Sequence, residues 1–200
     1  MISTIVTMSR ARAAHGAVSD DALLSRFTRG DGEALGELFD RHHRAAYRFL
    51  SRLTGAHDAD LDDLVQATFM EVARAAPRFD GRAAVRTWLF GIALNVARRY
   101  KRGNARRRRV ISDAAGADRP SDVPARERPD ESVENRELLA AVERAIHGLP
   151  PALREAFVAC EIEELPGAEV ARLLGIPEGT LWRRLHDARK ALRAALGGRA

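Results

Sequence analysis

The chain has 200 residues, of which 46% are hydrophobic and 6% aromatic, and its formal net charge is +5 at pH 7. This length allows one domain or two small ones, and a composition dominated by Ala, Leu and Arg favours helix over strand. The single cysteine excludes an internal disulfide and a zinc site made of cysteines, and no apolar run is long enough to span a membrane. The positive charge favours nucleic acid as a partner, ahead of an anionic membrane surface.

The N-terminal residues contain no hydrophobic segment of signal-peptide length. We therefore expect a protein that remains in the cytoplasm, with residues 1–18 as a disordered leader and Met8 as an alternative start. Cys160 lies in the apolar run Ala156-Phe-Val-Ala-Cys160, and this setting favours a buried structural thiol over a redox sensor.

Four helices are predicted in the first part of the chain. We expect them to span about residues 19–29, 31–53, 58–75 and 85–102. Ser19 and Asp31 are suitable N-caps, because a side-chain oxygen at that position accepts a hydrogen bond from a free backbone N–H. Gly30 and Gly55 end the first two helices, and Gly81 is the expected turn point of the loop before the fourth.

Apolar residues recur at helical spacing along these segments and indicate the buried faces. The inward-facing residues of the last three helices, apolar except Thr68, are Leu35, Leu38, Phe39, Ala46, Tyr47, Leu50 and Leu53; Leu61, Leu64, Val65, Thr68, Phe69 and Val72; and Val85, Trp88, Leu89, Ile92 and Val96. Trp88 is therefore expected in the core rather than as a platform for an unpaired base. A separate polar stripe on the fourth helix contains Gly91, Asn95, Arg98 and Arg102.

The composition changes after the fourth helix. Residues 98–109 contain eight basic residues and no acid, whereas residues 112–137 contain eight acids and three prolines with almost no large apolar side chain. The basic run is either a phosphate-binding surface or simply solvated. Because the following segment buries too little surface to offset its ordering entropy, residues 103–131 are predicted to be a flexible linker, and the folded halves on either side need not touch.

The last part of the chain is predicted to be helical again. Ser132 is the expected N-cap of a helix that ends at Gly148, and Leu149-Pro-Pro151 begins another that runs to about Glu163. Residues 167–195 then read as helix, turn, helix, with the break at Gly175-Ile-Pro177. The second helix buries Leu181, Leu185, Ala188, Leu192 and Leu196 and has a basic outer face, a pattern typical of DNA-binding helix-turn-helix proteins. An ordinary helical hairpin with a solvated basic face is the alternative.

Other candidate sites are better explained by local structure. The carboxylates Asp58, Asp60, Asp62 and Asp63 fit a capped helix start with an acidic outer face, because no His or Glu cluster completes a metal site. His42 and His43 point to different sides of a helix and do not share a metal. The sequence contains no phosphate-binding loop and no nucleophile motif, so we expect no enzyme activity, no metal and no cofactor.

Two separated blocks resemble one family, the extracytoplasmic-function (ECF) sigma factors. Leu61-Asp-Asp-Leu-Val-Gln-Ala-Thr-Phe69 and Arg86-Thr-Trp-Leu-Phe-Gly-Ile-Ala-Leu-Asn-Val-Ala-Arg-Arg99 resemble region 2, while Leu149-Pro-Pro-Ala-Leu-Arg154, Glu169-Val-Ala, Leu174-Gly175 and Gly179-Thr-Leu resemble region 4. The resemblance implies an all-α fold of two small helical domains, 19–102 and 132–200, joined by the flexible linker.

The resemblance also implies a function. Such a protein binds core RNA polymerase and directs it to promoters, with the −10 element recognised by the first domain and the −35 element by the second. It needs no catalytic residue, because the polymerase supplies the chemistry, and an anti-sigma factor is an expected further partner.

The family's functional residues map onto this chain as follows. The polymerase-binding surface corresponds to Asp62, Asp63, Gln66, Phe69 and Glu71. The −10 candidates are Phe79, in the loop that ends at Ala84, and Asn95, Arg98, Arg99 and Arg102. The −35 candidates are Thr180, Trp182, Arg183, Arg184, His186, Arg189 and Lys190.

The chain also departs from the family pattern. Many members have Asp where this chain has Arg99, and Trp182, Arg183, His186 and Asp187 differ from the usual recognition-helix residues. These departures concern the DNA sequence that is read more than the class of protein. A stand-alone helix-turn-helix regulator that binds duplex DNA without polymerase is the alternative function, and a nucleic-acid-processing enzyme lacks a catalytic constellation.

Overall fold

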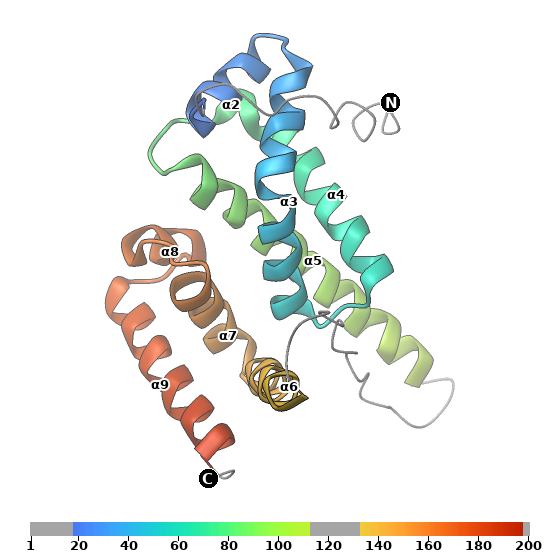
Figure 1. Cartoon of the computed structure of the whole chain (residues 1–200), viewed down its shortest axis with the longest axis vertical. Helices are drawn as coiled ribbons and strands as arrows, with labels where there is room; N and C mark the ends of the chain where they lie inside the picture. The colour runs from blue at the N-terminus through green and yellow to red at the C-terminus, as the bar shows by residue number, and fades with distance from the viewer. Residues whose placement is uncertain (1–17, 113–132, 198–200) are drawn as a thin grey trace.

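The computed structural model describes residues 18–112 and 133–197, and every regular element in these two stretches is a helix. The first half (residues 18–112) contains α2 (Asp20–Thr28), α3 (Gly32–Thr54), α4 (Asp58–Ala75), the short 3-10 helix η2 (Ala76–Arg78) and α5 (Val85–Ser112). The second half (residues 133–197) contains α6 (Val133–Gly148), α7 (Pro151–Phe157), the single π-helical turn η3 (Val158–Ile162), α8 (Gly167–Leu174) and α9 (Glu178–Gly197). The prediction of an all-α fold with two helical parts is confirmed (Figure 1). The predicted leader up to residue 17, residues 113–131 of the predicted linker and the expected N-cap Ser132 lie outside the described residues.

Helix boundaries follow the local signals in the sequence. The Ser19 hydroxyl accepts a hydrogen bond from the N–H of Ala22 at 3.2 Å, and an Asp31 carboxylate oxygen accepts one from the N–H of Glu33 at 3.1 Å. Gly55 ends α3 with φ of 65°, a left-handed conformation that is strained for residues with a Cβ atom. The helix α5 is ten residues longer than predicted, ending at Ser112 rather than Arg102. Arginine is a good helix former, so the basic run extends the helix instead of ending it.

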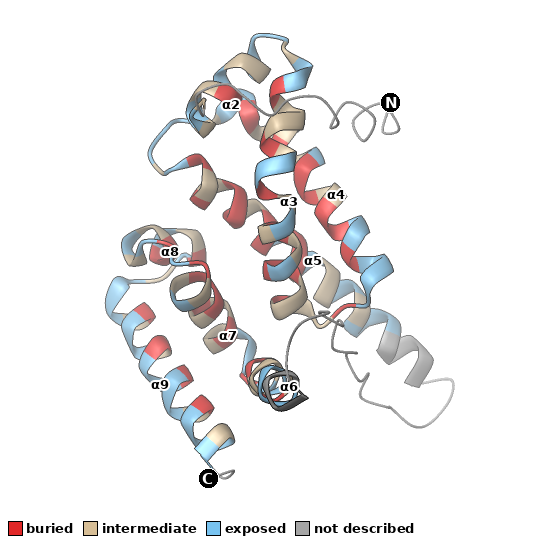
Figure 2. Cartoon of the chain, in the orientation of Figure 1, coloured by how far each residue is buried: buried red, intermediate tan, exposed pale blue. Residues whose placement is uncertain are grey.

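The core of the first half lies where α3, α4 and α5 meet, and Figure 2 shows the buried residues on their facing sides. The rings of Phe49 and Phe90, each 1% exposed, meet edge to face with centroids 4.8 Å apart. Trp88 is half-buried and packs against Phe79, with ring centroids 5.0 Å apart, as expected for a residue of the apolar stripe. His42 is also buried and lies 2.7 Å from an Asp20 carboxylate oxygen, which ties α2 to α3.

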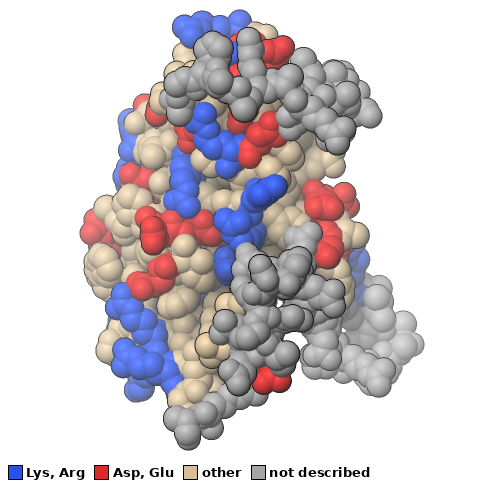
Figure 3. All heavy atoms as spheres, in the orientation of Figure 1, with Lys and Arg blue, Asp and Glu red and all other residues tan. Residues whose placement is uncertain are grey.

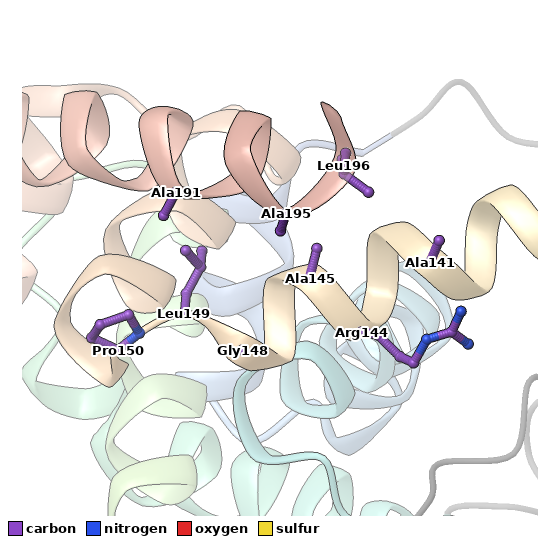
Figure 4. A pocket seen from close by; sticks show the side chains of 9 residues that line it. All are labelled: Ala141, Arg144, Ala145, Gly148, Leu149, Pro150, Ala191, Ala195 and Leu196. Atoms are coloured by element: carbon purple, nitrogen blue, oxygen red, sulfur yellow. The ribbon is translucent and has the colours of Figure 1, made fainter. Parts of the chain in front are cut away.

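The second half is organised around α7 and α9, which pack along each other. Leu181, Leu185, Ala188 and Leu192 of α9 are buried, as predicted, and Gly175 makes the turn before it with φ of 68°. A hollow of about 430 Å³ separates α6 from α9 and is lined mostly by small and apolar residues (Figure 4). These residues are Ala141, Arg144, Ala145, Gly148, Leu149, Pro150, Ala191, Ala195 and Leu196.

The two halves pack against each other, although a linker of this length leaves them no need to touch. One cluster of buried apolar residues runs through both. Gly91 of α5 lies directly against Leu173 of α8, and a Cβ atom added at Gly91 would lie only 2.5 Å from Cδ2 of that leucine. Polar contacts frame this packing: His147 Nε2 lies 3.1 Å from the carbonyl oxygen of Ser51, and Arg52 Nε donates to Glu143 at 3.2 Å.

A buried carboxylate, Glu163, lies between the halves and is 5% exposed. Arg86 donates to its side chain at 3.0 Å and to its backbone carbonyl at 2.7 Å, and Arg52 lies 3.9 Å from the carboxylate. Burial raises the pKa of Glu163, and Arg86, Arg52 and Arg48 lower it by less than burial raises it. The ion pair therefore helps to position the two halves relative to each other, and it adds little net stability.

Replacing Phe90 with Ala is expected to lower the free energy of unfolding by about 3–5 kcal/mol, because the loss of a fully buried ring leaves a cavity beside Phe49. Urea denaturation followed by circular dichroism measures the change. Met70, which is 42% exposed on α4, provides the control, and Met70→Ala should stay within about 0.5 kcal/mol of the wild type. Similar losses for the two variants would contradict the assignment of Phe90 to the core.

The raised pKa of Glu163 predicts a pH dependence of stability. The folded chain takes up this proton at a higher pH than the unfolded chain, whose carboxyl has the ordinary pKa of 4.5. The resulting stability is fully present below that pKa and is lost as pH rises through the folded pKa. Relative to Glu163→Gln, which stays neutral, the wild type should therefore lose free energy of unfolding as pH rises from about 4.5. Urea unfolding of both proteins over a pH series measures this difference, and a constant or opposite trend would contradict it.

Candidate nucleic-acid interface

An exposed polar face on α5 combines an amide with two guanidinium groups. Asn95, Arg99 and Arg102 are all exposed, and their spacing of four and three residues places them on one side of the helix. An amide can donate to and accept from a base edge, and arginines beside it can bind phosphates. This face therefore has the chemistry that nucleic-acid binding requires.

Arg98 was predicted to belong to the same DNA-binding group. In the structure it contacts the second half instead. It forms a forked ion pair with Glu155 of α7, with Nη2 2.7 Å and Nε 3.1 Å from the two carboxylate oxygens. The hydrogen bonds that Arg98 donates to Glu155 raise the pKa of Arg98 above its ordinary value, and burial acts against this. The structure thus places Arg98 against the second half, while Asn95 and Arg102 on the same stripe face solvent.

The loop before α5 contains the remaining −10 candidate. Phe79 is half-buried with its ring against Trp88, and Asp80 accepts a hydrogen bond from the N–H of Arg82 at 3.1 Å. Ten residues of helix separate the start of α5 at Val85 from Asn95, which is a distance of about 15 Å. The loop therefore precedes the helix that carries Asn95 and lies roughly three turns from it.

The polar residues predicted for the acidic face of α4 are accessible, but the predicted Phe69 is buried. Asp62 and Asp63 are exposed, and Gln66 and Glu71 are half-exposed. Phe69 is 6% exposed, and its ring lies edge-on to Phe39 at 4.8 Å, so it supports this face from the core and does not lie on it. Glu71 also approaches Arg74 at 3.3 Å and Arg99 at 3.5 Å, which brings the acidic face next to the polar face of α5.

The outer side of α9 is basic, and Figure 3 shows Lys and Arg side chains gathered over this helix. Its exposed candidates are Trp182, Arg183, His186, Arg189 and Lys190, whereas Thr180 and Arg184 are half-buried. Arg189 pairs with Glu161 at 2.6 Å. The Trp182 ring is 53% exposed and lies against Gly167, where an added Cβ atom would be 3.1 Å from it. This close approach positions the ring at the start of the basic face.

Several important residues were not identified from the sequence. Arg86, Glu155 and Glu163 hold the two halves together, and each has a partner more than 50 residues away in the chain. Arg154, 9% exposed, donates to the carbonyl oxygens of Leu53 at 3.2 Å and Leu149 at 2.9 Å. Arg154 ends the Leu149-Pro-Pro-Ala-Leu-Arg154 motif, and this motif was the signal that could have revealed it.

Two negative findings concern the described residues alone. Within 18–112 and 133–197, His, Cys, Asp and Glu form no group of three or more that could hold a metal ion. No helix in the same ranges is both long and apolar enough to cross a membrane. Cys160 is half-buried, and burial raises its pKa to about 11, which favours a structural thiol over a reactive one.

Comparison with known proteins matches both halves to one family. The family model for Sigma-70 region 2 matches residues 38–107, and the model for Sigma-70 region 4 matches residues 139–192. The ECF RNA polymerase sigma factor SigM of Mycobacterium tuberculosis (strain ATCC 25618 / H37Rv) is 36% identical over 181 residues, which are 90% of this chain and 85% of SigM.

Solved structures have the same fold. CnrH, determined in complex with the cytosolic domain of CnrY, is 27% identical with a TM-score of 0.65, and the match covers 90% of this chain and 99% of that one. The sigma factor RpoE of Bartonella quintana, determined with the anti-sigma factor NepR, is 24% identical with a TM-score of 0.64 over 82% of this chain and 97% of that one.

The curated relatives are sigma factors, which are transcription initiation factors and not classical enzymes. The order of the two matched regions, the helical fold of both halves and the identity to SigM agree with one another. They support a sigma factor over a stand-alone helix-turn-helix regulator. The chain therefore belongs to the extracytoplasmic-function family of RNA polymerase sigma factors.

Proposed function

We propose that this sigma factor uses α5 to bind the −10 element of its promoters, α9 to bind the −35 element and the acidic face of α4 to bind core RNA polymerase. The observation that carries the proposal is the pair of exposed polar and basic faces on α5 and α9, one in each of the two matched regions. The working domains are residues 19–102, whose last helix α5 continues to Ser112, and residues 132–200.

On the −10 side, Asn95 contacts a base and Arg99 and Arg102 contact the phosphates around it. Melting leaves a base unpaired, and extruding it costs a few kcal/mol that a pocket and positive charge can offset. Phe79 is half-buried and still presents part of its ring at the loop. Arg98 joins this set when Glu155 no longer holds it.

On the −35 side, α9 enters the major groove with its exposed basic face. Arg183, Arg184, Arg189 and Lys190 supply contacts to phosphates and guanine edges, with Thr180 and His186 beside them. Trp182 presents an apolar ring at the start of the helix, which suits contact with a thymine methyl group. Because Trp182, Arg183 and His186 differ from the family's usual recognition-helix residues, we expect the −35 sequence to differ as well.

On the polymerase side, Asp62, Asp63, Gln66 and Glu71 form the contact face, with Phe69 packed beneath it. The chain itself performs no catalysis and needs no cofactor, because the polymerase makes the RNA. It acts in the cytoplasm, where bacterial RNA polymerase works. A protein inhibitor of the anti-sigma class is a further partner, by analogy with CnrH and RpoE, which were determined with the cytosolic domain of CnrY and with NepR.

Run-off transcription tests the proposal directly. Core RNA polymerase is incubated with the purified chain and a library of genomic promoter fragments, with core alone as the control. Promoter-specific transcripts and a complex with core are the expected result. A palindromic footprint made by the chain alone, with no new transcripts, would instead support a stand-alone regulator.

Replacing Asn95 with Ala should reduce promoter opening by about tenfold or more, because a lost base contact costs about 1–3 kcal/mol. Permanganate reactivity of unpaired thymines in the −10 element measures opening, and co-elution measures binding to core. Core binding is expected to persist. An equal loss of both would show that Asn95 is structural.

Neutralising Asp62 and Asp63 together as Asn should weaken binding to core polymerase by about tenfold, since two exposed charges are lost from the contact face. Fluorescence anisotropy of the labelled chain titrated with core measures the affinity. Asp21→Asn with Glu33→Gln removes the same charge from exposed positions on other helices and is the matched control. Equal weakening by both double variants would point to net charge and not to this face.

A further inference from the structure

The outer face of α9 contains two adjacent stripes of side chains. Trp182, His186 and Arg189 follow one another at spacings of four and three residues, so they lie along one side of the helix, and all three are exposed. Arg183 and Lys190 lie about 100° further round the helix, because each follows a member of the first stripe by one residue. When one stripe points straight into a DNA groove, the other therefore faces the wall of that groove.

The first stripe is held at its start by a neighbour from α8. The ring of Trp182, which is 53% exposed, lies against Gly167, where an added Cβ atom would be 3.1 Å from Cζ2 and 3.2 Å from Cη2 of the ring. Gly167 does not have a positive φ, so its backbone does not require glycine. The missing side chain is instead what allows the ring to approach α8 this closely.

The same stripe is held at its other end by the π-helical turn η3. Glu161 accepts a hydrogen bond from Nη2 of Arg189 at 2.6 Å, and the side chain of Arg189 is still 45% exposed. A guanidinium has five N–H donors, so this hydrogen bond leaves the donors that O6 and N7 of guanine require. A long side chain that is already held also loses less rotamer entropy when it binds a base.

We propose, on the basis of the proposed function, that the stripe of Trp182, His186 and Arg189 reads the bases of the −35 element, with Gly167 and Glu161 as the positioning residues that fix its two ends. Specificity for DNA is then set in part by two residues outside α9. The second stripe, Arg183 and Lys190, contacts the phosphates that line the groove.

The two ends of the stripe have different chemical partners. The methyl group of thymine is the apolar group that base pairs display in the major groove, so it is the partner of the Trp182 ring, while Arg189 binds guanine. Trp182 and Arg189 are seven residues apart, which is about 10 Å along the helix, and base pairs are stacked about 3.4 Å apart. The stripe therefore requires a thymine and a guanine about three base pairs apart, with His186 over the pairs between them.

A promoter library tests the assignment of the stripe. Core polymerase with the full chain selects fragments of a promoter, identified by run-off transcription, whose −35 region is randomised, and core alone is the control. The wild type should enrich the thymine and the guanine. Trp182→Ala should lose the thymine and keep the guanine, whereas Arg189→Ala should do the reverse. Arg183→Ala should weaken binding to all the selected sequences alike, because phosphates carry no sequence information.

Base analogues test the two contacts atom by atom. Deoxyuridine lacks only the methyl group of thymine, so it should weaken binding of the wild-type complex about three- to fourfold and leave Trp182→Ala unchanged. 7-Deazaguanine lacks the N7 acceptor, so it should weaken the wild type at least about threefold and leave Arg189→Ala unchanged. Fluorescence anisotropy of labelled promoter fragments measures both ratios of affinity.

The same ratios test the positioning residues. Gly167→Leu should bring the thymine-to-deoxyuridine ratio close to one, because even a Cβ atom presses on the ring, whereas Gly148→Leu makes the same change in the second half with nothing within 4 Å. Glu161→Gln should lower the guanine-to-7-deazaguanine ratio, and Glu164→Gln, which removes the same charge at an exposed position, should retain it. Loss of charge acts on both DNAs alike and cancels in each ratio. Circular dichroism confirms that the variants remain helical.

The opposite results would overturn this assignment. They are a thymine preference that survives Trp182→Ala, a guanine preference that survives Arg189→Ala, and equal ratios for the positioning variants and their controls. A surviving thymine preference together with weaker binding to core would assign the Trp182 ring to a protein contact instead. If the wild type enriches no sequence beyond core alone, the proposed function itself fails, and that outcome is distinct from enrichment with unaltered preferences.

Discussion

The packing of the two halves depends on which side chains donate hydrogen bonds to the carbonyl groups at the C-terminal end of α3. The last carbonyl groups of a helix have no partner within it, and the Leu53 carbonyl accepts from Arg154 of α7 at 3.2 Å and from Lys101 of α5 at 3.0 Å. Arg154 also donates to the carbonyls of His147 and Leu149. Burial lowers the pKa of Arg154 and Lys101 because it disfavours their charged forms. The hydrogen bonds that they donate to these carbonyls offset that cost. One guanidinium thus joins the first half to the turn between α6 and α7.

The hydrogen bonds of Arg154 explain which residues of the two halves meet. Arg154 brings α7 against α3 and α5, and Glu155, the next residue, then lies where Arg98 can reach it. Glu163 follows at the end of the π-helical turn and meets Arg86. Ion pairs and apolar residues share this surface; the ion pairs fix its register and add little net stability.

The parts of the fold that could be predicted are those set by neighbouring residues. Ser19, Asp31 and Gly55 act through hydrogen bonds or backbone angles within a few residues, and their positions were read correctly. The end of α5 was placed ten residues too early because a run of like charge was interpreted as disorder, whereas arginine favours helix and solvent screens the repulsion. The pairing of Arg98 with Glu155, 57 residues apart, has no local pattern from which it could be derived.

The polar stripe of α5 shows why residue chemistry alone does not assign a partner. Gly91, Asn95, Arg98 and Arg102 share one side of the helix by spacing, yet the first and third contact the second half and the other two face solvent. The stripe is about 60° wide, so a neighbour that covers one edge leaves the other free. Arg98 lies at the covered edge of the stripe, next to Gly91. Its role is decided by which surface approaches it, and the position of the second half determines that.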